Sequence, residues 1–128
     1  MPSTKNIALV AHDAKKDAMT EWAKRNADIL SQHNLWATGT TGSRIAEATK
    51  LKIECLKSGP LGGDQQLGAM IAEGRLDILI FFTDPLSAMP HDVDVKALMR
   101  ISTLYETAMA CNEKTADYIL TSPILSGE

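Results

Sequence analysis

The chain has 128 residues, of which 45% are hydrophobic and 23% charged, and its formal net charge is −3. These values are typical of one compact globular domain and argue against a disordered or fibrous protein. Lysine and arginine occur in no run longer than a pair, so the basic stripe of a nucleic-acid-binding protein is missing, and the longest apolar run, residues 78–82, is far too short to cross a membrane.

The expected secondary-structure elements alternate regularly along the chain. Continuous apolar runs, typical of strands buried on both faces of a parallel sheet, predict strands at residues 7–11, 35–38, 52–56, 77–82 and 109–112. The segments between and after them predict helices at residues 14–32, 43–49, 64–73, 95–106 and 115–120. Asp13 is placed to cap the first of these helices.

This succession of β-α units predicts a fold of the α/β class. We expect a single domain spanning residues 1–128, with an open, mostly parallel five-stranded sheet and helices on both of its faces. The crossovers between parallel strands should be right-handed, which makes the arrangement Rossmann-like.

The cysteines and the amino-terminal residues indicate the cellular compartment of the protein. Cys55 and Cys111 fall in apolar, strand-like runs and form no Cys-x-x-Cys pattern, which predicts two buried thiols in a reducing compartment. The first residues, Met-Pro-Ser-Thr-Lys-Asn, lead directly into the first strand. We therefore expect a cytoplasmic protein.

Five short polar strings lie where the strands are expected to end, at residues 11–13, 38–42, 58–64, 84–85 and 90–94. The carboxyl ends of the strands in an open α/β sheet share one edge, so these strings should bring together glycine amides, hydroxyls, two imidazoles and several carboxylates. This mixture suits the binding and acid/base chemistry of a small phosphorylated substrate.

The string at residues 38–42 is a candidate phosphate site. It supplies glycines and threonine hydroxyls at a strand-to-helix turn, where free N–H groups and the positive end of the helix favour an anion. Glycines after strands are also ordinary turn residues, so this string is a weak indication alone. Ser58-Gly59 and Lys16 strengthen it, because they are expected at the same edge of the sheet.

Asp64 is the candidate catalytic carboxylate. It follows two glycines and precedes a helix, so an isolated Asp there would be interpreted as a helix N-cap. The preceding Ser-Gly-Pro-Leu-Gly-Gly favours catalysis, because glycines let a substrate approach the backbone closely. His12 and His91 are candidate acid/base groups, each beside an aspartate that can fix its tautomer, whereas His33 is interpreted as structural.

Two further aspartates, Asp84 and Asp94, are equally consistent with a turn or helix cap and with a functional role. The histidines and aspartates at this edge could in principle supply zinc ligands. No spacing of the His-x-x-x-His kind supports a metal site, and we predict none.

Taken together, five motifs strongly resemble the methylglyoxal synthase family. They are Ala-Leu-Val-Ala-His-Asp-Ala-Lys-Lys (8–16), Ala-Thr-Gly-Thr-Thr-Gly (37–42), Ser-Gly-Pro-Leu-Gly-Gly-Asp-Gln-Gln (58–66), Phe-Phe-Thr-Asp-Pro-Leu (81–86) and Pro-His-Asp-Val-Asp-Val-Lys-Ala-Leu (90–98). Their order and spacing fit that family across residues 6 to about 122. The motif at 58–66 is far more specific than any single glycine pattern.

This resemblance implies a lyase that converts dihydroxyacetone phosphate to methylglyoxal and inorganic phosphate. It implies no cofactor, a homohexamer, and inorganic phosphate as product and candidate regulator. The charge pattern and the short apolar runs predict neither a nucleic-acid nor a membrane partner. Asp64 matches the catalytic base, His91 the histidine at the reacting end of the substrate, and Asp84 and Asp94 match aspartates of the same site. The positions that match substrate and phosphate ligands, with one acidic neighbour, are His12, Asp13, Lys16, Thr38, Gly39, Thr40, Thr41, Ser58 and Gly59.

One feature departs from the family, and two alternative functions remain open. Some members carry a longer carboxyl-terminal segment with basic residues that close over the phosphate, whereas this chain has no Lys or Arg after Lys114. The first alternative is a regulatory module that binds a phosphorylated effector without reaction, which would not need both Asp64 and His91. The second is an isomerase that acts on the same triose phosphate.

Overall fold

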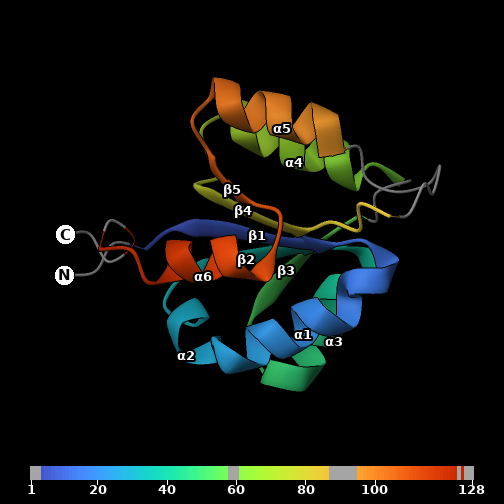
Figure 1. Cartoon of the computed structure of the whole chain (residues 1–128), viewed down its shortest axis with the longest axis vertical. Coiled ribbons are helices and arrows are strands. Elements are labelled where there is room, and N and C mark those ends of the chain that lie inside the picture. The colour runs from blue at the N-terminus through green and yellow to red at the C-terminus, as the bar shows by residue number, and fades with distance from the viewer. Residues whose placement is uncertain (1–3, 58–60, 87–94, 124, 126–128) are drawn as a thin grey trace.

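A parallel sheet forms the middle layer of the molecule (Figure 1). The computed structural model describes residues 4–57, 61–86, 95–123 and 125, and within them the sheet has five strands in the order β3-β2-β1-β4-β5. The strands are β1 (Asn6–Ala11), β2 (Asn34–Thr38), β3 (Ile53–Leu56), β4 (Ile78–Phe82) and β5 (Ala108–Ala110). Every neighbouring pair is parallel.

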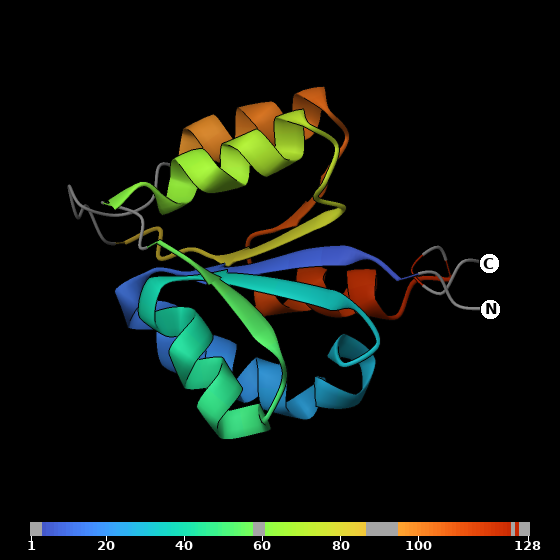
Figure 2. The same cartoon turned by 180° about the vertical axis from the view of Figure 1, so that it is seen from behind.

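Helices cover both faces of this sheet (Figures 1 and 2). On one face lie α4 (Gly63–Ala72) and α5 (Val95–Leu104). On the other lie α1 (Lys16–Arg25), α2 (Ala27–Leu30), α3 (Gly39–Thr49) and α6 (Glu113–Leu120), with a short 3-10 helix, η1 (Asp13–Lys15), before α1. This arrangement confirms the predicted α/β fold with an open parallel sheet.

The strand β1 shows why its run of apolar residues is continuous. Successive side chains of a strand point to opposite faces, so Ile7 and Leu9 pack in the core beneath α1 and α6, while Ala8 and Val10 pack beneath α4 and α5. Because helices cover both faces, neither set can be polar. The same reasoning applies to β4, in which every residue is buried.

The long first helix predicted at residues 14–32 is wrong, because the structure divides that segment. It forms η1, α1 and α2, and the backbone leaves helical geometry at Asn26, whose φ is −114° and ψ is 17°. The Asn26 side chain donates to the carbonyl of Trp22 and so satisfies a group at the end of α1. Asp13 does not cap the helix as predicted, because it lies within η1 and pairs with Lys16.

Two helices begin at least two residues earlier than predicted. The helix α3 begins at Gly39 rather than at residue 43, so Thr40 and Thr41 lie in its first turn instead of in a loop, and Thr38 is its N-cap. The helix α6 begins at Glu113 rather than at 115, because the Asn112 side chain accepts the Thr115 N–H at 2.9 Å and caps the helix.

The prediction that both cysteines are buried is also wrong. Cys55 is exposed and Cys111 is half-buried, and both are free thiols. Cys55 lies on β3, an edge strand with no neighbouring strand on its outer side among the described residues, and that position explains its exposure. Partial burial raises the pKa of the Cys111 thiol.

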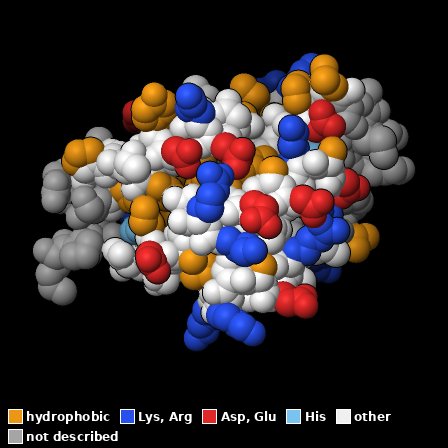
Figure 3. Space-filling model, turned by 60° about the horizontal axis from the view of Figure 1, so that its bottom comes forward, with side chains coloured by type: hydrophobic (Ala, Val, Ile, Leu, Met, Phe, Trp, Pro, Cys, Tyr) orange, Lys and Arg blue, Asp and Glu red, His pale blue; other side chains and the backbone are white. Residues whose placement is uncertain are grey.

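The helical face at the bottom of Figure 1 carries mixed charge. Figure 3 shows acidic and basic side chains interspersed over it, and several form exposed ion pairs, among them Arg44–Asp17 at 2.9 Å and Arg25–Glu113 at 2.8 Å. Each such exposed pair contributes little to stability. Within the part of the chain that the structure describes, no helix is long and apolar enough to span a membrane.

Ser102 offers a test of the core. Its side chain, on α5, is 2% exposed, and its hydroxyl has no hydrogen-bond partner among the described residues. We expect Ser102→Ala to raise the free energy of unfolding by about 1 kcal/mol, because the unpaired polar group is removed from the core. Urea unfolding would measure the change, and Thr103→Ala, on the exposed side of the same helix, is the control. A clear loss of stability in Ser102→Ala would contradict this account.

His33 should make stability depend on pH. Its Nδ1 accepts the Lys5 N–H at 3.0 Å, and burial, aided by the charge of Lys5, lowers the pKa of His33 below its ordinary value of 6.5. The unfolded chain therefore binds the proton first as the pH falls, so the contribution of neutral His33 is present above about 6.5 and is lost as the pH falls through the folded pKa. We expect the difference in unfolding free energy between the protein and His33→Gln to shrink over that window. A difference independent of pH would contradict the assignment.

Candidate active site

The order of the strands defines where a site is expected. β1 pairs with β2 on one side and with β4 on the other, so the direction of winding reverses between β1 and β4. In open α/β sheets ligands bind outside the carboxyl ends of the strands at this switch point. His12 directly follows β1, and Asp84 lies just beyond β4.

His12 links these two strand ends. Its backbone N–H donates to the Phe82 carbonyl at 3.1 Å, and its ring Nδ1 accepts the backbone N–H of Asp84 at 2.8 Å. The ring is only 8% exposed and packs edge-on against Phe81. Because Nδ1 is an acceptor, the neutral ring carries its proton on Nε2, and His12 is a hydrogen-bond donor at that atom.

The Asp84 carboxylate forms a turn. Its Oδ1 accepts the Leu86 N–H at 3.1 Å, two residues on, while the Asp84 N–H is directed at His12. The turn interpretation of Asp84 is therefore seen in the geometry. Sequence reasoning missed the contact with His12, and no local signal could have revealed it, because the two residues are 72 positions apart.

Two substitutions of Asp84 distinguish the role of its negative charge from the role of its hydrogen bond in the turn. Asp84→Asn keeps an oxygen that can accept the Leu86 N–H, so we expect the turn and the His12 tautomer to persist. Asp84→Ala removes the acceptor and should lower the free energy of unfolding by about 1 kcal/mol. The ¹⁵N chemical shifts of the His12 ring should then report a mixture of tautomers. An unchanged ring spectrum in Asp84→Ala would show that the turn does not hold the N–H in place.

Lys16 connects the start of α1 to the start of α3. Its Nζ lies 2.8 Å from Asp13 Oδ1 and donates to Thr40 Oγ1 at 2.7 Å. The Lys16 side chain is 19% exposed and that of Asp13 is 83% exposed. The hydrogen bond and the charge of Lys16 lower the pKa of the Asp13 carboxyl below its ordinary value.

The first turn of α3 has the properties of an anion site. Thr38 is the N-cap in extended geometry, Gly39 has a φ of 49°, which favours glycine, and Thr41 is buried. The first N–H groups of a helix have no partner within the helix, and they carry partial positive charge. Lys16 and Thr40 therefore lie where an anion would also meet helix N–H groups.

Gly42 has a packing role rather than a turn role. It lies inside α3, and a Cβ there would be 2.8 Å from Cys55 Sγ and 3.2 Å from Ala37 Cβ. The missing side chain lets α3 approach β2 and β3 closely. This close approach positions the first turn of α3 against the sheet edge.

Asp64 lies in the first turn of α4. The helix N-cap is Gly62, with a φ of 111°, so the interpretation of Asp64 as the N-cap is wrong. The half-buried carboxylate accepts the N–H of its neighbour Gln65 at 3.0 Å. Within the described ranges, no hydrogen bond or ion pair joins Asp64 to His12, Lys16 or Thr40.

The structure therefore brings together two groups of predicted residues, His12 with Asp84 and Asp13 with Lys16 and Thr40. Four predicted site residues lie outside the described residues, and these are Ser58, Gly59, His91 and Asp94. Across the described ranges there is no group of three His, Cys, Asp or Glu side chains that could hold a metal ion.

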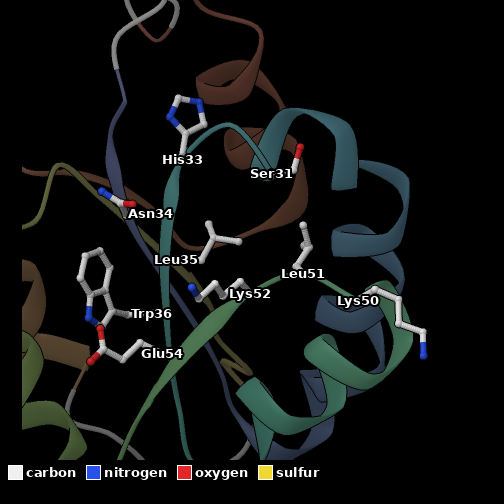
Figure 4. Close-up of a pocket in the computed structure, with 9 residues that line it drawn as sticks. All are labelled: Ser31, His33, Asn34, Leu35, Trp36, Lys50, Leu51, Lys52 and Glu54. Atoms are coloured by element: carbon white, nitrogen blue, oxygen red, sulfur yellow. The ribbon is translucent and has the colours of Figure 1, made fainter.

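A separate hollow lies at the opposite end of the sheet (Figure 4). Its volume is about 670 Å³, and its lining includes His33 and Trp36 of the β2 segment and Lys52 and Glu54 of the β3 segment. Figure 4 shows that Lys50, at its margin, points away from the other labelled side chains. None of the predicted site residues lines this hollow.

The fold and the position of the polar groups first define a class, that of open α/β proteins with a small-molecule site at the switch point of the sheet. The family model described as "MGS-like domain" matches residues 18–111. The methylglyoxal synthase of Leptospira interrogans is 58% identical, over 96% of this chain and 83% of its own length, and that of Rhizobium rhizogenes is 60% identical, over 94% and 96%. The crystal structure of methylglyoxal synthase from Elizabethkingia anophelis superposes with a TM-score of 0.94 at 53% identity, over 98% of this chain and 83% of that one.

The chain belongs to the methylglyoxal synthase family, and it is an enzyme. This confirms the family that the five sequence motifs predict.

Proposed function

We propose that the protein is a carbon–oxygen lyase that converts dihydroxyacetone phosphate to methylglyoxal and inorganic phosphate. The relatives bear the name of a synthase of that product. The observation that carries the proposal is the contact of Lys16 Nζ with Thr40 Oγ1 at the first turn of α3. It places a cation, a hydroxyl and helix N–H groups together, as a phosphate requires, at the carboxyl edge of the sheet that also holds His12.

The proposed roles divide between the two ends of the substrate. The groups proposed for the phosphate and the substrate oxygens are His12, Lys16, Thr38, Gly39, Thr40, Thr41, Ser58 and Gly59, and Asp13 is the acidic neighbour of these groups. Those proposed for the chemistry are Asp64, His91, Asp94 and Asp84. For Asp84, the turn and the N–H to His12 support a positioning role. An active Asp84→Asn enzyme would agree with that role, whereas a large loss of turnover would assign the chemistry to the carboxylate.

The first step is removal of a proton from the hydroxymethyl carbon, next to the ketone. A carbanion there is unstable in water, so a base must act while a donor stabilises the charge that grows on the carbonyl oxygen. Asp64 is the proposed base, and it takes the proton to give a carboxylic acid and an enediolate. His91 is the proposed donor to the carbonyl oxygen, and the Nε2–H of His12 is the proposed donor to a second substrate oxygen.

The second step is loss of phosphate. The π electrons of the enediolate move to form a new carbon–carbon double bond to the carbon that carries the phosphate, as the carbon–oxygen bond to phosphate breaks and the phosphate leaves with that bond's electron pair. The terminal hydroxyl becomes the aldehyde carbonyl, and its proton passes to the central oxygen, which gives the enol of methylglyoxal. The enol product then tautomerises to methylglyoxal. Elimination requires the breaking bond to stand near perpendicular to the enediolate plane, and a phosphate held by Lys16 and the first turn of α3 could enforce that torsion.

The test is incubation of the protein with dihydroxyacetone phosphate while free phosphate and dicarbonyl are followed together. Equal release of both is the expected result. A phosphorylated aldose without free phosphate would indicate the isomerase instead. Tight binding without any product would indicate the regulatory binding module.

We also propose that residues 1–128 act as one domain of a cytoplasmic homohexamer, with inorganic phosphate as product and regulator. The resemblance to the family supports the assembly and the regulation. Light scattering of the purified protein would test the hexamer, and inhibition kinetics with phosphate would test the regulation.

A further inference from the structure

The lysine proposed to bind the phosphate already has an anionic partner within the chain. Lys16 Nζ lies 2.8 Å from Asp13 Oδ1 and 2.7 Å from Thr40 Oγ1. An ammonium has three N–H donors, so these two contacts use most of its capacity. A phosphate that reaches Lys16 therefore meets the Asp13 carboxylate beside it.

The two partners of this ion pair differ in exposure and in the number of their contacts. The Lys16 side chain is 19% exposed and is also held by Thr40, whereas the Asp13 side chain is 83% exposed. Breaking an exposed ion pair costs little, because water solvates the released carboxylate. The carboxylate can therefore leave while the ammonium stays at the first turn of α3.

Among the described residues, the two aspartates near the start of α1 each have a basic partner. Asp13 pairs with Lys16, and Asp17, one turn further along α1, pairs with Arg44 of α3 at 2.9 Å. Lys16 also lowers the pKa of the Asp13 carboxyl below its ordinary value of 3.8, and that group is ionised at neutral pH. An incoming phosphate thus gains the attraction of Lys16 only to the extent that Asp13 moves away.

The geometry points to Asp13 as an internal competitor of phosphate, which occupies Lys16 in the empty site and leaves it when a phosphate binds. This inference rests on the proposed function in taking Lys16 as a phosphate ligand. The competition weakens the binding of the substrate's phosphate group and of the product phosphate alike, because both bind the same Lys16 ammonium. A carboxylate poised to return to Lys16 also favours departure of the product.

A positioning role would predict the opposite sign. If Asp13 holds Lys16 in place for the phosphate, removing its carboxylate weakens phosphate binding. If Asp13 competes, removing it strengthens phosphate binding. Damage to the fold also weakens binding, so a tighter variant cannot arise from a structural defect.

The experiment is calorimetric titration of the full chain with inorganic phosphate at low ionic strength. We expect Asp13→Asn to bind phosphate tighter by a factor of about two to five, the range that an exposed ion pair allows. The matched control is Asp17→Asn, which removes the same charge from the start of α1 but whose partner is Arg44. Its effect measures the general loss of negative charge.

A second comparison ties the effect to the lysine. In a Lys16→Met background, Asp13→Asn should no longer strengthen phosphate binding beyond the effect of Asp17→Asn. The inference is overturned if Asp13→Asn binds phosphate no tighter than Asp17→Asn, if the gain survives in Lys16→Met, or if the unaltered protein binds no phosphate. The product assay separates the proposed function from the proposed competition. If the unaltered protein forms methylglyoxal but Asp13→Asn does not bind phosphate more tightly, only the competition is refuted.

Discussion

Asp64→Asn should lower the turnover of dihydroxyacetone phosphate by about 10²–10⁴-fold, the loss typical of removing a general base. An amide cannot take the proton from the substrate carbon. Its oxygen can still accept the Gln65 N–H that Asp64 Oδ1 accepts at 3.0 Å, so the first turn of α4 should persist. Initial rates of methylglyoxal formation measure the effect, and binding of an enediolate-like phosphate analogue checks that the site is intact.

Glu73→Gln is the matched control for Asp64→Asn. It makes the same change from carboxylate to amide, at the carboxyl end of the same helix, where Glu73 is exposed and pairs with Arg75. Its turnover should equal that of the unaltered protein. An Asp64→Asn enzyme as active as Glu73→Gln would refute Asp64 as the base.

Trp22→Ala should lower the free energy of unfolding by about 3–5 kcal/mol, the usual cost of removing a large aromatic side chain from a core. Trp22 is fully buried on α1, and its ring packs edge-on against Phe82 of β4 at a centroid distance of 5.6 Å. Its Nε1–H donates to Asp117 of α6 at 2.9 Å. The side chain therefore joins α1, α6 and the sheet, and urea unfolding would measure its loss.

Trp22→Phe separates the contribution of apolar packing from that of the hydrogen bond. Phenylalanine keeps most of the apolar bulk near Phe82 and loses the hydrogen bond to Asp117, which is exposed and can be solvated by water. We expect its destabilisation to be well below that of Trp22→Ala. Lys24→Ala, at an exposed position of the same helix, should change stability by less than about 0.5 kcal/mol. A Trp22→Ala protein as stable as Lys24→Ala would show that the core adapts without Trp22.

The strands and their parallel direction could be predicted because burial on both faces of a sheet leaves a continuous apolar run in the sequence, whereas the order of the strands in the sheet was not predicted. Residues 7–11 and 78–82 are continuous apolar runs, and the structure buries both strands between two layers of helices. Helix boundaries were less predictable. The break at Asn26 and the early start of α3 at Gly39 depend on how the ends pack, and the periodicity of apolar residues does not report packing at a helix end.

The five motifs were enough to predict the family by resemblance, and their places after the strands predict one edge of the sheet for the site, because a parallel topology brings all strand ends to one side. The contacts there could not be predicted. His12 meets the Asp84 N–H across 72 positions, and Lys16 meets Thr40 across 24. The tautomer of His12 and the pairing of Lys16 with Asp13 arise only when packing fixes the distances between separate loops, since hydrogen bonds and ion pairs depend on ångström-scale geometry that residue order does not encode locally.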